Sequence, residues 1–288
     1  MSEKKIFHHY DIAYRVIGEE QFHLVKTPDY GWTADPFLTY YKGDLYLFAE
    51  IFLYKSERNG VIGYAKWEND HFSDWTVTMD KHWHLSYPNV WCENDKLYMC
   101  PESYQLEEVA IYELEEFPNK WIKKKVLLDN VEYCDNTFLD IHDGFRYMFT
   151  FKRGQKSPEG TGLLYKFSDI DSPQFKVLSD SLRGTRCGGK ICNIDGKNIR
   201  VGQDCVKEYG NALIFYAIDS VWPNYKEHEI KRIGIKDIKI ENPAREYSGI
   251  HTYNRVDPIE VIDLRYASST SEEMEASDRV HRVFVDKY

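Results

Sequence analysis

Charged residues at the starts of short, strand-like segments are the side chains of this sequence with the clearest chemical potential. Asp35 precedes a proline, Asp135 precedes an asparagine, and Arg186 precedes a cysteine and two glycines. Two carboxyl groups can divide the work of general base and general acid, whereas an arginine fork binds phosphate or carboxylate and cannot act as an acid. We therefore predict Asp35 and Asp135 as catalytic residues and Arg186 as the holder of an anionic group.

Two further carboxyl groups are candidates for a proton donor. Glu102 and Asp204, like Glu50, fall near the end of the second strand of their segments. A protonated carboxyl group there could donate to a leaving oxygen. The same position could be purely structural, with the carboxylates accepting backbone hydrogen bonds in tight turns. Glu102 and Asp204 are therefore predicted as alternative catalytic acids.

A second group of residues is predicted to hold the substrate. Aromatic residues make up 15% of the chain, and although most of them suit packing in β-sheets, an aromatic face also matches the apolar face of a sugar ring. Polar and positive side chains near the segment starts would complete the pocket. The predicted substrate-binding residues are Arg186, His251, Trp32, Tyr87, His84, Lys190 and Tyr209. No cofactor is predicted, although His251 could also hold a central ion through water.

A repeat of about 50 residues indicates how these side chains are positioned. Three pairs of matching residues are each separated by 52 positions: Pro36 and Pro88, Tyr46 and Tyr98, and Glu50 and Glu102. Such a period, with two evident strands and room for two more, is typical of a propeller blade. We predict an all-β fold, a five-bladed β-propeller, as a single domain over residues 1–288 with blade starts near residues 35, 87, 135, 187 and 251. Because an unpaired strand edge is a liability, a strand at 6–16 or at 280–285 is expected to close the ring.

Composition excludes several classes of function. The chain has 288 residues, a net charge of −10 and a pI near 5.5, so it lacks the basic footprint of a nucleic-acid binder. No apolar run approaches the roughly 20 residues that span a bilayer, and the N-terminus does not resemble a secretory signal. None of the six cysteines forms a C-x-x-C pair. These features predict a cytoplasmic protein with no integral membrane segment and no nucleic-acid partner.

Several segments carry a resemblance to a known family. They are WTADPFLTYYKGDLYLFAE, HLSYPNVWCENDKLYMCPES, RCGGKICN with VGQDCVKEYG, and GIHTYN. Together, and in this order, they resemble the N-terminal domain of the glucosamine inositolphosphorylceramide transferase family, over roughly residues 14–254. The resemblance implies a fold and a sugar context, such as the assembly of surface polysaccharides or glycolipids. In the plant enzymes the recognised glycosyltransferase domain lies elsewhere in the polypeptide, and nothing in this chain resembles it.

A more distant resemblance is to the five-bladed glycoside hydrolases of the arabinanase and β-xylosidase clan. It implies that Asp35, in Ala-Asp-Pro, is a general base and that Asp135 tunes the acid. Those enzymes keep a glutamate acid at the start of the fourth blade, where this chain has Arg186. A phosphate leaving group needs little protonation, so an arginine at this place favours glycosyl transfer over simple hydrolysis.

The residues and the resemblance together favour a carbohydrate-active enzyme whose site lies in the central pocket of the propeller. We predict glycosyl transfer or processing in surface-polysaccharide or glycolipid biosynthesis, with a sugar, sugar-phosphate or nucleotide-sugar ligand. A glycoside hydrolase with a displaced general acid is the first alternative. A glycan-binding module without catalysis is the second.

Overall fold

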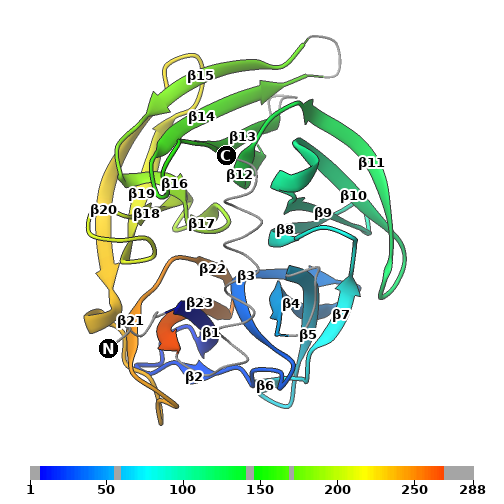
Figure 1. Cartoon of the computed structure of the whole chain (residues 1–288), viewed down its shortest axis with the longest axis vertical. Coiled ribbons are helices and arrows are strands. Elements are labelled where there is room, and N and C mark those ends of the chain that lie inside the picture. Colours follow the sequence, from blue (N-terminus) through cyan, green and yellow to red (C-terminus); the bar gives the residue numbers. More distant parts are fainter. Residues whose placement is uncertain (1–6, 55–59, 141–145, 169–171, 269–288) are drawn as a thin grey trace, which may run out of the picture.

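The computed structural model describes residues 7–54, 60–140, 146–168 and 172–268. Within these ranges the chain forms strands and two short 3₁₀ helices, η1 (Tyr104–Leu106) and η2 (Ile235–Asp237). The strands form five antiparallel sheets that surround a common axis (Figure 1). The prediction of an all-β, five-bladed propeller is confirmed.

The first two blades follow the predicted starts. The first contains β3 (Gly31–Tyr41), β4 (Asp44–Leu53), β5 (Gly60–Glu68) and β6 (His71–Phe72), with β7 (Thr76–Met79) also paired to β5. The second contains β8 (Ser86–Glu93), β9 (Lys96–Glu102), β10 (Glu108–Glu116) and β11 (Lys120–Asp129).

The third and fourth blades have the same order from the axis outward. The third contains β12 (Tyr133–Asp140), β13 (Arg146–Arg153), β14 (Gly160–Phe167) and β15 (Gln174–Ser179). The fourth contains β16 (Arg183–Cys187), β18 (Lys197–Asp204), β19 (Ala212–Ser220) and β20 (Lys226–Gly234), with β17 (Cys192–Ile194) also paired to β18.

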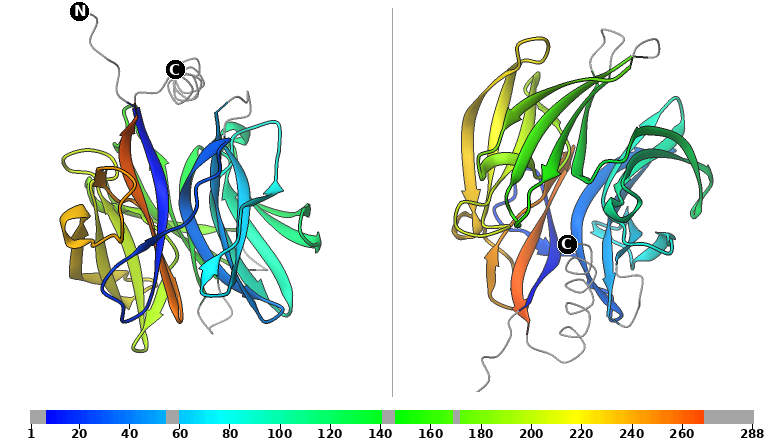
Figure 2. Two further views of the ribbon diagram at one scale, coloured as in Figure 1. Left: turned by 90° about the horizontal axis from the view of Figure 1, so that it is seen from below. Right: turned by 45° about the horizontal axis from the view of Figure 1, so that its top comes forward.

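The fifth blade joins two distant parts of the chain. It contains β21 (Tyr247–Gly249), β22 (Tyr253–Val256), β23 (Ile259–Ser268), β1 (Phe7–Val16) and β2 (His23–Leu24). β1 pairs with β23 from Phe7 opposite Ser268 to Val16 opposite Ile259, and the two strands run side by side in dark blue and orange-red (Figure 2). The N-terminal strand therefore closes the ring. The alternative strand, at 280–285, lies outside the described residues.

A bulge recurs at the start of the innermost strand in three blades. The register shifts between Ala34 and Phe37 in β3, and at matching places in β8 and β12. The bulged residues Asp35, Tyr87 and Asp135 have φ values of 53°, 43° and 55°. This left-handed conformation is uncommon for residues with a side chain, and bulges often re-aim a side chain beside an active site. The bulges thus place Asp35 and Asp135 at equivalent positions around the axis.

Closure of the fifth blade can be tested in its core. Ile12 of β1 is fully buried, so Ile12→Ala should lower the free energy of unfolding by about 2–4 kcal/mol, as for other buried aliphatic truncations. Urea denaturation measures the change. Ile230→Ala, at an exposed position of β20, is the matched control and should cost less than about 0.5 kcal/mol. Equal losses for both variants would contradict the closure by β1.

Candidate functional site

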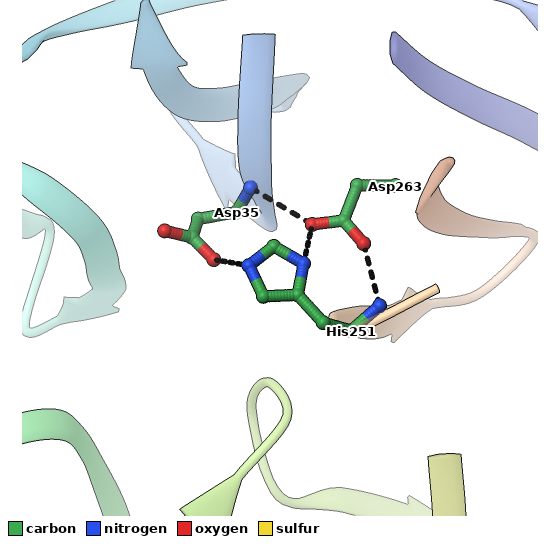
Figure 3. A group of neighbouring side chains, drawn as sticks. All are labelled: Asp35, His251 and Asp263. Carbon is green, nitrogen blue, oxygen red and sulfur yellow. Dashed lines mark hydrogen bonds and ion pairs between the residues drawn. The ribbon is translucent and has the colours of Figure 1, made fainter. Parts of the chain in front are cut away.

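Asp35, His251 and Asp263 form a buried row at the inner end of the first and fifth blades (Figure 3). Nε2 of His251 lies 3.4 Å from Oδ1 of Asp35, and its Nδ1 lies 2.6 Å from Oδ2 of Asp263. The imidazole is therefore held between two carboxyl groups, one on each ring nitrogen. This arrangement fixes the ring and couples the ionisation of Asp35 to the protonation of His251.

Backbone and hydroxyl groups fix the two carboxyl groups of this row. Asp263 accepts hydrogen bonds from the backbone N–H groups of Asp35, His251 and Thr252, at 3.2, 2.9 and 2.9 Å. Asp35 accepts from the Thr252 hydroxyl at 2.9 Å and from the Tyr87 N–H at 3.2 Å. Because Asp263 bonds to the chain on both sides of His251 and at Asp35, it joins the first and fifth blades at the site.

A second buried group lies between the second, third and fourth blades. The Arg186 guanidinium donates Nε to Oδ2 of Asp135 and approaches Oδ1 through Nη2 at 3.4 Å. Glu102 accepts the Asp135 backbone N–H at 3.1 Å. The Arg186 side chain is 15% exposed, and among the described residues its Nη1 has no hydrogen-bond partner. Arg186 therefore keeps one donor edge for a ligand.

Aromatic rings link the two groups. The Tyr10 ring stacks on His251 with centroids 4.4 Å apart, and the Tyr209 ring meets His251 edge-on at 5.3 Å. The Arg186 guanidinium carbon lies 4.8 Å from the Tyr209 ring centroid, a cation–π distance. Tyr209 thus contacts both the histidine and the arginine.

Burial changes the acidity of the carboxyl groups. Loss of solvent raises the pKa of Asp35 to about 6, although the nearby His251 opposes the rise. Burial, with repulsion from Asp135, raises the pKa of Glu102 to about 8. Burial also raises the pKa of Glu50 well above its usual value. At pH 7 the site therefore holds an ionised Asp35 and a protonated Glu102.

The basic groups show the opposite balance of forces. Burial disfavours a charge on His251, but attraction to Asp263 and Asp35 outweighs it, so the pKa of His251 is raised. His84 lies 3.5 Å from Glu50, but burial lowers its pKa to about 4. Only one of the two histidines thus favours the charged form.

Among the residues that the structure describes, two sets of side chains have the spacing of metal ligands. One is Asp35, His251 and Asp263, and the other is Glu102, Cys134 and Asp135, each with ligand atoms within 4.8 Å of one another. In the first set, Asp263 already accepts three backbone N–H groups. In the second, burial raises the pKa of Cys134 well above its usual value, whereas a metal binds the thiolate. The donors of the first set thus already have hydrogen-bond partners, and the thiol of the second set favours its protonated form.

Tyr87 and Trp32, both predicted to bind substrate, contact other parts of the protein instead. The Tyr87 hydroxyl accepts the Gly189 N–H at 2.7 Å and lies 2.8 Å from the Thr137 hydroxyl, so it connects three blades. The Trp32 ring lies parallel to Phe52, at 4.8 Å, and to His9, at 5.2 Å. Trp32 is 9% exposed, so little of its ring is open to a ligand.

Lys190 and Asp204 lie apart from the two groups. Lys190 donates to the Val90 carbonyl at 3.3 Å, farther along β8. Asp204 accepts from Arg232 of β20 at 2.8 Å, toward the outside of the fourth blade. The structure thus brings together Asp35, Asp135, Glu102, Arg186, His251 and Tyr209, with His84 beside Glu50.

Sequence reasoning missed Asp263, Thr252 and Tyr10. Asp263 lies in the second strand of its blade, as Glu50 and Glu102 do, and the repeat of acids at that place could have indicated it. Thr252 follows His251 directly, and no sequence signal marks it. Tyr10 belongs to the strand that closes the ring, so its position depends on which of two candidate strands does so.

The comparisons with known proteins agree with this architecture. The family described as "Glucosamine inositolphosphorylceramide transferase 1, N-terminal" matches residues 11–257. The chain belongs to this family. It is 31% identical over 223 residues to glucosamine inositolphosphorylceramide transferase 1 of Oryza sativa subsp. indica, covering 72% of this chain and 29% of the relative. It is 34% identical over 218 residues to the protein of the same name from Arabidopsis thaliana, covering 68% and 27%. The family member thus spans less than a third of the length of these relatives.

Solved structures share the fold. An α-L-arabinofuranosidase from Podospora anserina, solved in complex with cellotriose, has a TM-score of 0.58 at 9% identity and covers 90% of this chain and 98% of its own. The catalytic domain of the GH62 α-L-arabinofuranosidase of Coprinopsis cinerea has a TM-score of 0.61 at 10% identity, covering 88% and 97%. At these identities the similarity establishes the propeller fold alone. The described part of the family member has no helix of the length and apolar character needed to cross a bilayer.

The buried Glu102 should make stability depend on pH. Its pKa is about 8 in the folded protein and 4.5 when unperturbed, so the folded state keeps a proton that the unfolded chain releases. Stability from this group is complete below pH 4.5 and is lost as the pH rises through 8. The side chain in Glu102→Gln cannot ionise. We compare the free energy of unfolding of this variant with that of wild type at pH 8.5 and at pH 5. The variant-minus-wild-type difference should be larger at pH 8.5, by more than about 1.4 kcal/mol, the value of one pKa unit.

Chemical denaturation at the two pH values measures this difference. The exposed Glu246→Gln is the matched control and should show the same difference from wild type at both. A Glu102→Gln effect that does not change with pH would contradict the buried, protonated carboxyl group.

Proposed function

We propose that the chain is a carbohydrate-active enzyme that transfers glycosyl groups in the assembly of surface polysaccharides or glycolipids, with its site at the centre of the propeller. The observation that carries the proposal is that the centre holds both an ionised Asp35, next to His251, and an Arg186 that keeps a free donor edge. A base and an anion-binding group are what transfer from a phosphate-bearing donor requires. The names of the plant relatives support the same class of reaction.

In this proposal Asp35 activates the acceptor. Its pKa of about 6 leaves it ionised at neutral pH yet basic enough to take a proton as the bond forms. The Thr252 hydroxyl and the Tyr87 N–H hold the carboxylate in one orientation. His251, fixed by Asp263, limits the build-up of negative charge beside it.

Arg186 acts at the other side of the sugar. The acceptor oxygen forms a bond to the anomeric carbon, the bond from that carbon to the phosphate oxygen breaks, and the phosphate leaves with the electron pair. The acceptor proton goes to Asp35. Nη1 of Arg186 binds the departing oxygens, while Asp135 holds the guanidinium in place. No acid is needed because phosphate is a stable anion.

A glycoside hydrolase is the second candidate, and one observation favours it. Glu102 has a pKa of about 8, so it carries a proton at neutral pH, as a general acid must. Its Oε2 accepts the Asp135 N–H, which leaves the other oxygen for a proton. In this case Glu102 would protonate the leaving oxygen, and Asp35 would activate water.

We also propose that residues 1–288 act as one domain and that the protein is cytoplasmic. The six cysteines are unpaired thiols, as is usual in reducing compartments.

Asp35→Asn tests whether Asp35 acts as the general base. The variant should lower turnover about 100- to 10,000-fold, the usual contribution of general base catalysis, and should keep sugar binding. A product-resolved assay with pooled nucleotide sugars, sugar phosphates and aryl glycosides measures turnover, and titration calorimetry measures binding. Asp74→Asn, at an exposed ion pair, is the control. Full activity in Asp35→Asn would contradict the role, and binding without any turnover by wild type would favour a glycan-binding module.

Arg186→Lys and Glu102→Gln separate transfer from hydrolysis. Arg186→Lys keeps a charge beside Asp135 but loses the fork, so KM for phosphate-bearing donors should rise about tenfold or more, the value of one charge-assisted hydrogen bond, while aryl glycosides are unaffected. Glu102→Gln should lower hydrolysis of aryl glycosides at least 100-fold if Glu102 is an acid, and should leave transfer within about tenfold. Unchanged KM values in Arg186→Lys would reject the anion site.

A further inference from the structure

A pocket separate from the central site lies between the third and fourth blades. It encloses about 490 Å³ and is lined by residues of β15, β16, β18, β19 and β20, together with the turn before β20. These strands lie at the side of the ring in Figure 1. The volume is within the range of small-molecule sites. None of the residues assigned to the central site, and none of the sugar-binding residues predicted from the sequence, lines this pocket.

Strand β16 divides the pocket from the centre. Thr185 lines the pocket, whereas the next residue, Arg186, reaches Asp135. Successive side chains of a strand point to opposite faces, so one strand contributes to two sites. Gly184, with φ of 80°, also lines the pocket, and a Cβ there would meet the Tyr216 hydroxyl at 2.1 Å. The glycine lets the Tyr216 ring lie directly against the strand.

The floor of the pocket is a rigid, buried ion pair. Arg200 donates Nε and Nη2 to the two oxygens of Glu227 at 2.8 and 2.6 Å, and its side chain is only 4% exposed. Its guanidinium lies 4.9 Å from the Tyr216 ring centroid, and the Tyr225 hydroxyl donates to Glu227 at 2.5 Å. These contacts hold aromatic and planar polar groups together at the floor of the pocket.

Most of the charges at the rim are already paired. Arg183 forms a fork with Glu229 at 2.7 and 3.1 Å, and Asp219 pairs with His228 at 2.9 Å. A ligand that relied on charge would have to break these pairs. Among the described residues one lining charge, the exposed Lys226, has no ion pair, whereas Arg183 and Arg200 would have to share their partners with a strong anion.

We propose that this pocket binds a neutral saccharide. Paired arginines and carboxylates still offer spare N–H groups and lone pairs side by side, and a sugar hydroxyl both donates and accepts. The Tyr216 and Tyr225 rings supply surface for the apolar face of a sugar. Leu178 is the single aliphatic residue of the lining, so a hydrophobic ligand would bury polar groups without partners. The site would hold part of a glycan to one side of the central pocket, and its existence does not depend on the reaction proposed there.

Titration calorimetry with the full chain tests the proposal, with cellotriose, xylotriose and mannotriose as neutral probes and glucose 1-phosphate as a charged probe. Ser179→Phe fills the pocket and should weaken binding of a neutral trisaccharide at least tenfold. Val177→Phe, on the same strand but exposed and outside the lining, is the matched control and should bind as wild type does.

A second variant protects the test against misfolding. Asp219→Ala removes an exposed lining residue and should weaken binding severalfold with an unchanged melting temperature. The proposal is overturned if no neutral trisaccharide binds wild type, or if Ser179→Phe, folded by its melting curve, binds normally. Preference for glucose 1-phosphate in the pocket would reject the neutral class.

Discussion

The burial of five carboxyl groups around two cationic groups is the constraint on which the centre of this molecule depends. Asp35, Glu50, Glu102, Asp135 and Asp263 are buried together, with Arg186 and His251 as the partners that favour a positive charge. Full ionisation would leave uncompensated negative charge in a region of low polarity, which is costly. The molecule meets this constraint by raising the pKa of Glu50 and Glu102, so that Glu102 keeps its proton at neutral pH, and by surrounding Asp263 with backbone N–H groups.

A local distortion that is repeated in several blades positions these carboxyl groups. Each of the first three inner strands has a bulge whose central residue is left-handed, and two of these residues are the aspartates of the centre. The acids of the second strands lie beside the bulges, as the pairing of Ala34 with Glu50 and of Ser86 with Glu102 indicates. Asp35, Glu102 and the backbone donors around them thus come from the same local geometry, which is used in several blades.

The sequence could predict the blades because hairpins repeat in residue type and spacing. It could also place Asp35 and His251 at blade starts. It could not show that Asp263 lies on the far side of His251, because that depends on the register of β23. Asp204 and Lys190 do not lie where the repeat predicted. The inner strand of the fourth blade is short and its register shifts between Arg183 and Cys187, so equivalent positions face other neighbours.

The pairing of β1 with β23 has a consequence for how the protein is made. Phe7 meets Ser268, so the last blade cannot be completed until residue 268 has left the ribosome. At about 5–20 residues per second, β1 waits for tens of seconds with an unsatisfied edge. The ring therefore closes only after β23 has been synthesised, and a nascent chain paused before β23 exposes a strand that chaperones or neighbouring nascent chains can capture.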